Sequence, residues 1–409
     1  MRWLPSGMLL PVLTLLPLDR GLTLSELGMA AAAQGFVVFL LELPTGGLSD
    51  SLGRRPVMVA AGLISLVGLA LILTADSFAV FALAFAVQGI YRALDSGPLE
   101  AWYVDAVQAR DPDADLSEGL SRGGTVAGVA IGGGALLAGA LVALGPIGSI
   151  EPLAVPVVVA AVFRVVSVLA TMKLLVEPGR SMSWSASITA AGEVPGVISG
   201  SLRLLRRSRI LQALVCIELC WGIGAIAYES LTPIRIAEVL DDADRAGAIM
   251  GPAAAAAWLA SAGGAALTPM LSRRIGVART AAATRLAQAV FIATMTLFAG
   301  PIGLVVAFLA CYLADGASSP MHMTLLHKEV TGEHRTTILS LSSMVFQPAS
   351  ALGLLLLTNV AEAASVTSAM LVGAVAVALA VPLYLPAFRA ERRSELAGDV
   401  EGPPAGSIS

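Results

Sequence analysis

Charged side chains are scarce in this sequence. Asp, Glu, Lys and Arg account for 13% of the 409 residues, whereas soluble domains carry roughly a quarter. Hydrophobic residues reach 56%, and the mean hydropathy is +0.82. This composition excludes an ordinary water-soluble protein. Apolar stretches of about 20 residues, long enough to cross the hydrocarbon core of a bilayer, recur throughout the chain. We therefore predict a polytopic membrane protein.

Aromatic residues and lysines are also rare. Aromatics make up 5% of the chain, whereas there are 41 glycines. This balance favours closely packed helices, and hence an all-α fold, over a β-barrel with aromatic girdles. The only lysines, Lys173 and Lys328, do not belong to a phosphate-binding G-x-x-x-x-G-K-[ST] loop. An ATP-driven pump would therefore need a partner subunit to bind the nucleotide.

Neither the cysteines nor the histidines form a recognisable site. Cys216, Cys220 and Cys311 lie in apolar runs without a C-x-x-C motif, and the three histidines are scattered. The apolar runs contain no H-E-x-x-H or G-x-S-x-G motif of the kind an intramembrane enzyme would use. We expect no catalytic residues, no metal and no cofactor, and do not expect an enzyme.

The apolar runs, bounded by charges or by Gly and Pro clusters, place about twelve membrane spans. The first run ends without a small-residue cleavage site, so we interpret it as a span rather than a signal peptide. The predicted spans are 4–18, 27–48, 56–75, 78–99, 121–144, 152–172, 210–232, 246–270, 278–299, 301–320, 337–359 and 364–387.

A polar stretch divides these spans into two sets of six. Residues 1–174 are predicted to form one six-helix bundle and 210–388 a second. Between them, 175–209 is a cytoplasmic loop whose LRLLRRSRI segment predicts a basic helix on anionic lipid, not a nucleic-acid site. Residues 389–409 are predicted to be a disordered tail. The pattern L-S-x-x-[LI]-G follows both the second and the eighth span, which indicates two related halves.

The basic residues predict the orientation in the membrane. With both termini in the cytoplasm, nineteen Lys and Arg residues fall on the cytoplasmic side, and Arg20, Arg235 and Arg245 fall on the other side. We therefore predict a multi-pass protein of the cell (inner or plasma) membrane with cytoplasmic N and C termini.

The segment between the second and third spans carries the most specific motif. It reads LELPTGGLSDSLGRRPVMV and resembles the signature of the major facilitator superfamily, G-x-L-[AS]-D-x-x-G-R-[RK]. The preceding E-x-P-T-G resembles a branch rich in drug and metabolite exporters. SGPLEAWYVD and RTTILSLSSM extend the resemblance to the fourth and eleventh spans. The matching motif positions are Gly46, Leu48, Ser49, Asp50, Gly53, Arg54 and Arg55.

The resemblance implies a secondary transporter, a monomer whose two bundles rock about a site at mid-membrane. In such a protein Gly46 lets helices approach closely and Gly53 permits a tight reversal. Asp50 pairs with Arg54, and the resemblance adds Asp105 of the fourth span to their network.

We name the cluster Gly46, Asp50, Gly53, Arg54, Arg55 and Asp105 the inner latch, formed when the cavity faces outward and broken when it faces inward. A simple positive-inside turn with a solvated charge pair is the alternative.

Ionisable residues at membrane depth are functional candidates because they are costly to bury unless paired or hydrated. The predicted spans contain Glu42, Arg92, Asp95, Arg164, Glu218, Arg285 and Asp315. Four acids and three bases suggest mutual pairing rather than a bare charged pore.

Glu42 is the candidate for proton coupling. It precedes Asp50 by two helical turns, and a carboxylic acid in an alternating cavity can take up and release a proton as its surroundings change. A permanent ion pair with Arg92 is the alternative. Arg92 and Asp95, in RALDSG, partly resemble the family motif R-x-x-Q-G. Arg92 could regulate the proton affinity of Glu42, hold an anionic substrate, or form a structural pair with Asp95.

The family fold implies that Glu218 and Asp315 lie on cavity-lining helices. Trp221 and Tyr228 follow Glu218 near one face, so an acidic and aromatic wall for amphiphilic or cationic ligands is one interpretation. Ordinary core packing is the other. Arg285 is expected to extend toward the inner face.

The resulting hypothesis is a proton-coupled exporter of a drug-like compound or metabolite. The glycine-rich GVAIGGGALLAG of the fifth span partly resembles an antiporter motif, although helix packing explains small residues four apart equally well. Proton-linked uptake of a small metabolite is the second hypothesis. A non-transporting membrane scaffold or sensor is the third.

Overall fold

The computed structural model describes residues 2–109, 111, 114–177, 205–206, 208–329 and 335–400, and its elements are almost all helices. The first half comprises α1 Leu4–Leu9, α2 Leu15–Asp19, α3 Leu24–Leu52, α4 Arg54–Thr74, α5 Phe78–Asp95, α6 Pro98–Gln108, α7 Ser117–Ala143 and α8 Val155–Leu174, with a 3₁₀ turn at Pro152–Ala154. The second half comprises α10 Arg209–Glu229, α11 Leu231–Leu240, α12 Ala243–Ile275, α13 Val277–Met295, α14 Pro301–Lys328, α15 Arg335–Ala363, α16 Val366–Leu379 and α17 Leu385–Val400, with a 3₁₀ turn at Pro382–Tyr384.

Ten helical segments of the described chain are long and apolar enough to cross a membrane. The two remaining predicted spans correspond to α1–α2 and α13. The first is split around Pro11, whose missing N–H disfavours a continuous helix. The helix α13 contains Arg279 and Arg285, which lower its hydropathy. The chain is therefore a multi-pass helical membrane protein.

Short sequence signals set the ends of the long helices. Thr23 and Glu26 form a capping box that starts α3, with Oγ1 of Thr23 accepting from the Glu26 amide at 3.2 Å. Gly53 ends α3 with φ +92°, and Gly276 ends α12 with φ +87°. Both glycines occupy a backbone region that other residues rarely adopt. The repeated L-S-x-x-[LI]-G pattern therefore marks the same sharp turn in each half.

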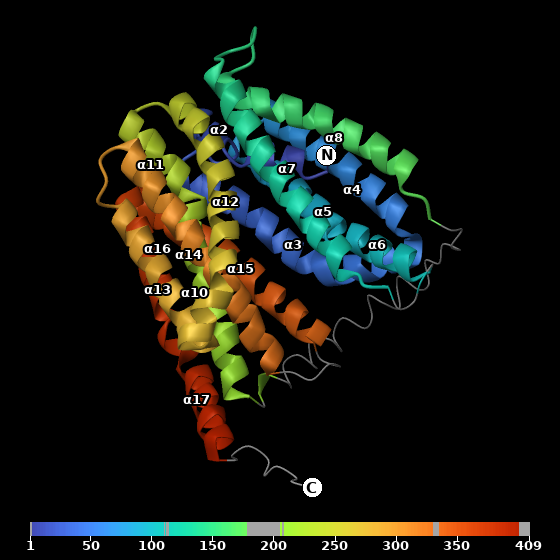
Figure 1. Cartoon of the computed structure of the whole chain (residues 1–409). Helices are drawn as coiled ribbons and strands as arrows, with labels where there is room; N and C mark the ends of the chain where they lie inside the picture. The colour runs from blue at the N-terminus through green and yellow to red at the C-terminus, as the bar shows by residue number, and fades with distance from the viewer. Residues whose placement is uncertain are drawn as a thin grey trace.

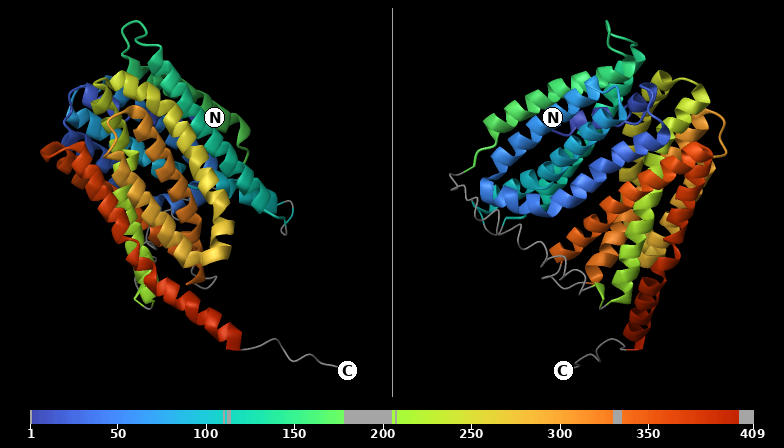
Figure 2. Two further views of the ribbon diagram at one scale, coloured as in Figure 1. Left: turned by 60° about the vertical axis from the view of Figure 1, so that its left-hand side comes forward. Right: turned by 180° about the vertical axis from the view of Figure 1, so that it is seen from behind.

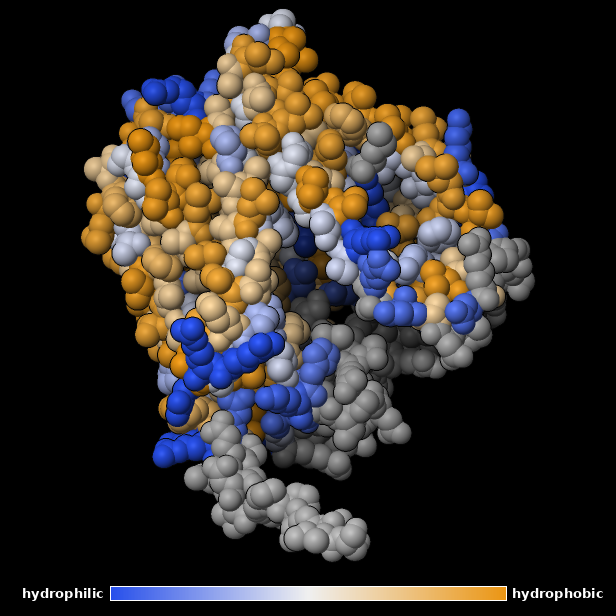
Figure 3. All heavy atoms as spheres, viewed as in Figure 1, coloured by the Kyte–Doolittle hydropathy of each residue, from blue (hydrophilic) through white to orange (hydrophobic). Residues whose placement is uncertain are grey.

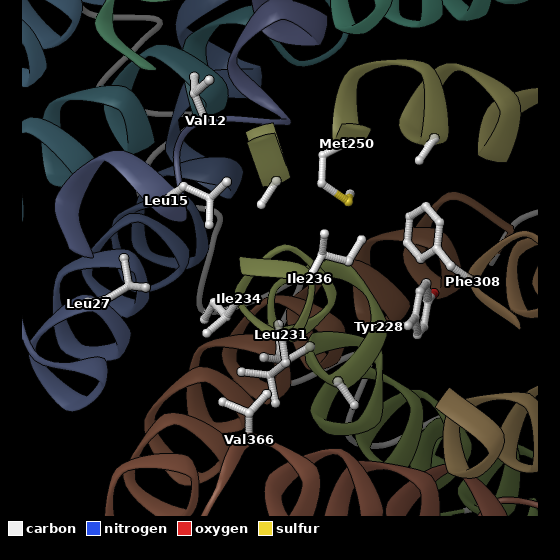
Figure 4. Packing of buried hydrophobic residues seen from close by; sticks show 14 of the residues in the cluster. Val12, Leu15, Leu27, Tyr228, Leu231, Ile234, Ile236, Met250, Phe308 and Val366 are labelled. Carbon is white, nitrogen blue, oxygen red and sulfur yellow. The ribbon is translucent and has the colours of Figure 1, made fainter. Parts of the chain in front are cut away.

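The helices form two groups that diverge from a common contact region. Figures 1 and 2 show α3, α4, α5, α7 and α8 on one side and α10, α12, α13, α14, α15 and α16 on the other. The two groups meet where α3 lies against α15 and α7 lies against α12. One buried hydrophobic cluster crosses this junction, where Leu15 and Leu27 lie near Ile234 and Leu231 (Figure 4).

Among the described residues, the two groups touch at one end of these helix pairs. We call this the acidic end, because Asp241 and Asp242 lie there, and the opposite end, with Arg54, Arg273 and Arg274, the basic end. At the acidic end Gly28 of α3 lies against Thr358 of α15. In the same region α7 approaches α12 so closely that a Cβ at Gly139 would lie 2.8 Å from the Ala248 carbonyl oxygen.

The groups separate toward the basic end. A Cβ at Gly124 or Gly128 of α7 would have no described atom within 4 Å. Figure 3 shows the surface hollowed between the two groups, while hydrophobic residues cover much of the outer surface. The part of the chain that the structure describes is therefore closed at the acidic end and open at the basic end.

Two predictions for the polar segments have different outcomes. The prediction that residues 389–409 are disordered is wrong for 389–400, because α17 continues to Val400. Its Ala, Glu, Arg and Leu residues are good helix formers. Residues 202–204 and 207 of the predicted basic helix, and all of 401–409, lie outside the described residues.

Candidate functional site

A cavity of about 380 Å³ lies between the two groups of helices. Its walls come from the α1–α2 turn, α3 and α5 on one side and from α10, α11 and α15 on the other. Most of the lining is apolar and includes Phe85 and Phe346. The polar side chains that line it are Thr14, Gln34, Arg92, Glu229, Ser230, Gln347, Ser350 and Thr358. Such a size and mixture are typical of a small-molecule site.

Among the described residues, one cation and one anion line this cavity. Arg92 comes from α5 and Glu229 from the end of α10, and both side chains are exposed. Within the part of the chain that the structure describes, neither makes an ion pair at 4.0 Å or less. Sequence reasoning missed Glu229, although it lies inside the predicted span 210–232. The rule that ionisable residues at membrane depth are functional candidates would have identified Glu229 if it had been applied to every residue of this span.

Glu42 lies beyond the cavity on the same face of α3. Leu27, Ala31, Gln34 and Val38 line the cavity, and Glu42 follows Val38 by four residues, one turn closer to the basic end. Glu42 has an interaction partner in the structure, and the alternative of a permanent ion pair with Arg92 stays a prediction.

Asp95 is buried inside the first half rather than paired with Arg92. Its Oδ2 accepts from Nε of Arg2 at 3.0 Å and from the Tyr91 hydroxyl at 3.3 Å. The alternative of a structural pair between Arg92 and Asp95 is therefore wrong, because Arg2 pairs with Asp95 instead. Arg164, to which sequence analysis assigned no role, stacks on Tyr91 at 4.4 Å and donates to the Arg2 carbonyl at 3.3 Å.

Glu218 is buried in the second half. Its Oε1 accepts from the Ser342 hydroxyl at 2.7 Å and lies 3.1 Å from Nε2 of His322. The other ring nitrogen of His322 lies 3.1 Å from the Tyr384 hydroxyl. This set joins α10, α14, α15 and the turn before α17. Glu218 does not line the cavity, and no sequence pattern indicated that His322 would be its neighbour.

Asp315 pairs with Arg285 at the centre of the second half. Nη1 of Arg285 donates to Oδ1 of Asp315 at 3.1 Å and to Gln288 at 2.5 Å, and Gln288 donates to Asp315 at 3.1 Å. The guanidinium also lies 4.9 Å from the Trp221 ring. Arg285 is 1% exposed. The expectation that it extends to the inner face is wrong, because it has buried partners.

The two predicted cavity aromatics have different positions. Tyr228 is fully buried and contacts Tyr312 edge-to-face at 5.2 Å, so placing it in the cavity wall was wrong. At this position of α10 the side chain points into the second half, while Glu229 faces the cavity. Trp221 is half-buried and stacks on Phe346 at 4.5 Å. Trp221 therefore packs against Phe346, whose ring lines the cavity.

The inner-latch residues lie at the basic end. Nη1 of Arg54 lies 2.6 Å from Oδ2 of Asp105, as the resemblance implied. The amides of Arg54 and Arg55 donate to the two oxygens of Glu177 at 2.8 and 3.0 Å. The side chain of Asp50 and the surroundings of Gly46 lie outside the described residues.

A matching contact occurs in the second half. The Ala278 amide, at the start of α13, donates to Oε2 of Glu391 at 3.0 Å, just after the turn at Gly276. Lys328 reaches Oε1 of Glu391 at 3.3 Å. Glu177 and Glu391 therefore bind equivalent helix N-termini, where backbone N–H groups attract anions. The sequence analysis identified neither carboxylate. Among the described residues, no group of three or more His, Cys, Asp or Glu side chains could hold a metal.

Comparisons with known proteins agree on the fold. Residues 1–354 match the family described as Major Facilitator Superfamily. No curated protein matches the sequence. The structure resembles the nucleoside transporter NupG, with 12% identity, a TM-score of 0.76, and coverage of 95% of this chain and 96% of that one.

Two further solved structures show the same similarity. A bacterial homolog of the human lysosomal transporter Spinster, in an inward-facing and occupied conformation, has 14% identity, a TM-score of 0.75 and 95% coverage of both chains. A POT family transporter in complex with a thioalcohol conjugated peptide has 13% identity, a TM-score of 0.68, and coverage of 96% of this chain and 94% of that one. At these identities the likeness concerns the fold alone.

Proposed function

The chain belongs to the Major Facilitator Superfamily, and from this premise we propose that it exports a drug-like compound or metabolite in exchange for protons by alternating access. The observation that supports this most is the cavity between two helix groups that touch at the acidic end and separate at the basic end. A protein of this family is a transporter rather than an enzyme and needs no cofactor.

The charge distribution supports cytoplasmic termini and a cell-membrane location. Because basic residues concentrate on cytoplasmic loops, the basic end of the structure faces the cytoplasm in this proposal. The conformation is then inward-facing. The residue ranges 1–174 and 210–388 act as the two moving bundles of a monomer, with helices α3, α7, α12 and α15 as their contact surfaces.

One contact of the inner latch is present although the proposed conformation is inward-facing, so in this proposal the part of the latch that breaks is the contact between the halves. Arg54 already contacts Asp105 of its own half in the inward-facing conformation. We propose that the contact between halves at this rim forms only when the basic end closes, with Asp50 contributing. The branch resemblance of E-x-P-T-G supports export.

Glu42 is proposed as the proton-coupling residue, because it continues the cavity-lining face of α3 toward the open end. The test is transport by everted membrane vesicles, with a panel of toxic compounds and with or without an uncoupler. Glu42→Gln is expected to abolish uncoupler-sensitive transport while the amount of protein in the membrane stays the same. Glu118→Gln is the matched control, since Glu118 is exposed and paired with Arg122 at the basic end.

Transport by Glu42→Gln that remained sensitive to the uncoupler would show that Glu42 is structural. Accumulation only in right-side-out vesicles would favour the alternative, proton-linked uptake. A scaffold or sensor would keep one pattern of cysteine accessibility across the cavity under all conditions, whereas a transporter would show two.

A further inference from the structure

Arg92 and Glu229 differ from the other charges at membrane depth. Three other acids have basic neighbours within the protein: Asp95 has Arg2, Asp315 has Arg285 and Glu218 has His322. Arg92 and Glu229 instead face one cavity from opposite halves, and both are exposed to it. The cavity therefore presents a cationic wall and an anionic wall.

This arrangement is costly in a membrane protein unless something compensates it. A charged side chain at membrane depth must be hydrated or paired, and a site that closes around it removes the water. Arg92 and Glu229 attract each other across the cavity but do not come within the 4.0 Å of an ion pair in this conformation. A ligand that carries both charges would satisfy Arg92 and Glu229 together.

We propose that the cavity binds zwitterionic ligands with an apolar body, placing an anionic group on Arg92 and an ammonium group on Glu229. The inference rests on the proposed function in naming the substrate class of the same cavity. A carboxylate matches the planar fork of an arginine, and the Glu229 carboxylate accepts hydrogen bonds from an ammonium group.

The remaining walls fit the body of such a ligand. Phe85 and Phe346 supply aromatic surface, and the amides of Gln34 and Gln347 supply hydrogen-bonding groups from the two halves. A cavity of about 380 Å³ is large enough for a small hydrophobic dipeptide or an aromatic amino-acid conjugate. The ligand class is therefore small amphiphilic zwitterions rather than simple cations.

Binding between the halves also has a conformational consequence. A ligand changes a conformational equilibrium only through different affinities for the two states. Because Arg92 and Glu229 belong to different halves, a zwitterion that bridges them favours states in which the two walls approach. Singly charged ligands lack one of these contacts, and neutral ligands lack both.

The test uses purified full-length protein in detergent and a panel of hydrophobic dipeptides and aromatic amino-acid conjugates. Each compound is used in four forms: unblocked, N-acetylated, C-amidated and doubly blocked. Affinities are obtained from the ligand-dependent rise in thermal unfolding temperature. The unblocked form of at least one compound is expected to bind about 10- to 100-fold more tightly than its singly blocked forms.

Two variants assign each charge to its partner. Arg92→Gln should abolish the difference between free and amidated carboxyl groups while the preference for a free amine remains. Glu229→Gln should do the reverse. Arg122→Gln and Glu238→Gln are controls, since both residues belong to local pairs outside the cavity.

Several outcomes would overturn the inference. The first is that no unblocked compound binds, and the second is that all four forms bind with equal affinity. The third is that both variants lose affinity for all four forms equally. The last result would indicate that Arg92 and Glu229 pair directly in another conformation and act structurally. Binding of unblocked compounds without uncoupler-sensitive transport would instead refute the proposed proton coupling and leave the ligand class intact.

Discussion

Gly139 provides a direct test of what holds the acidic end closed. A Cβ at this position of α7 would lie 2.8 Å from the Ala248 carbonyl oxygen and 2.8 Å from Cα of Gly251, both on α12. These neighbours are backbone atoms and cannot rotate away. We predict that Gly139→Val separates α7 from α12 and moves the protein toward the conformation open at the acidic end.

The size of the effect follows from the overlap. Relief of the Cβ contact alone requires a separation of roughly 0.6 Å, before the valine methyl groups are considered. Overpacking of this kind costs about 1–3 kcal/mol. If the cost falls only on the conformation closed at the acidic end, the ratio of the two conformations changes roughly 5- to 150-fold.

Gly133→Val is the matched control, because Gly133 lies on the same helix and its Cβ would have no described atom within 4 Å. Both substitutions place the same β-branched residue in a helix. The assay is pulsed electron resonance between spin labels at exposed positions Ser121 of α7 and Arg274 of α12, with the three native cysteines replaced. Both labels lie at the basic end.

The expected result is a shorter distance population in Gly139→Val that is absent in Gly133→Val, because the basic end closes as the acidic end opens. If the two variants gave the same distance distribution, the α7–α12 contact would not be what holds the acidic end closed. The rocking of the two halves as we describe it would then be refuted.

Two further perturbations test other parts of the structure. Asp315→Ala removes the partner of a buried arginine and should lower the free energy of unfolding by about 3–5 kcal/mol, measured by denaturation in detergent. Asp315→Asn should cost less, since its oxygen can still accept from Arg285 and Gln288; equal losses would show that the contacts are unimportant. Glu362 of α15 accepts from the Ser25 amide of α3 at 2.6 Å across the two halves. Glu362→Gln should shift the Ser121–Arg274 distances in the same direction as Gly139→Val, but by less. Added salt should reproduce this shift in the unsubstituted protein. A distance distribution that does not change with salt would contradict this prediction.

Local sequence features predicted the helices and their turns well. Apolar length placed the spans, and the glycines of the L-S-x-x-[LI]-G pattern marked turns that the structure confirms at Gly53 and Gly276. The signature motif also predicted the family, because it depends on residues close together in the chain. The Arg54–Asp105 contact was accessible only through the resemblance.

Partners of the buried charges could not be predicted in the same way. Arg2 reaches Asp95 over a separation of 93 residues, and Glu218 reaches Ser342 over 124. Neither periodicity nor spacing specifies such contacts. Helical position also misled the interpretation of α10: Tyr228 and Glu229 are adjacent, yet one points into the second half and the other into the cavity. One residue of rotation decides which of the two lines the cavity.

The paired roles of Glu177 and Glu391 have a mechanical consequence. Each carboxylate fastens the chain just beyond the sixth membrane crossing of its half to the start of the third, so each half is braced against itself at the cytoplasmic rim in our proposed orientation. These braces do not resist separation of the halves. In this conformation the described contacts between the halves lie at the opposite rim, and substitutions there should alter the speed of the cycle more than the shape of either lobe.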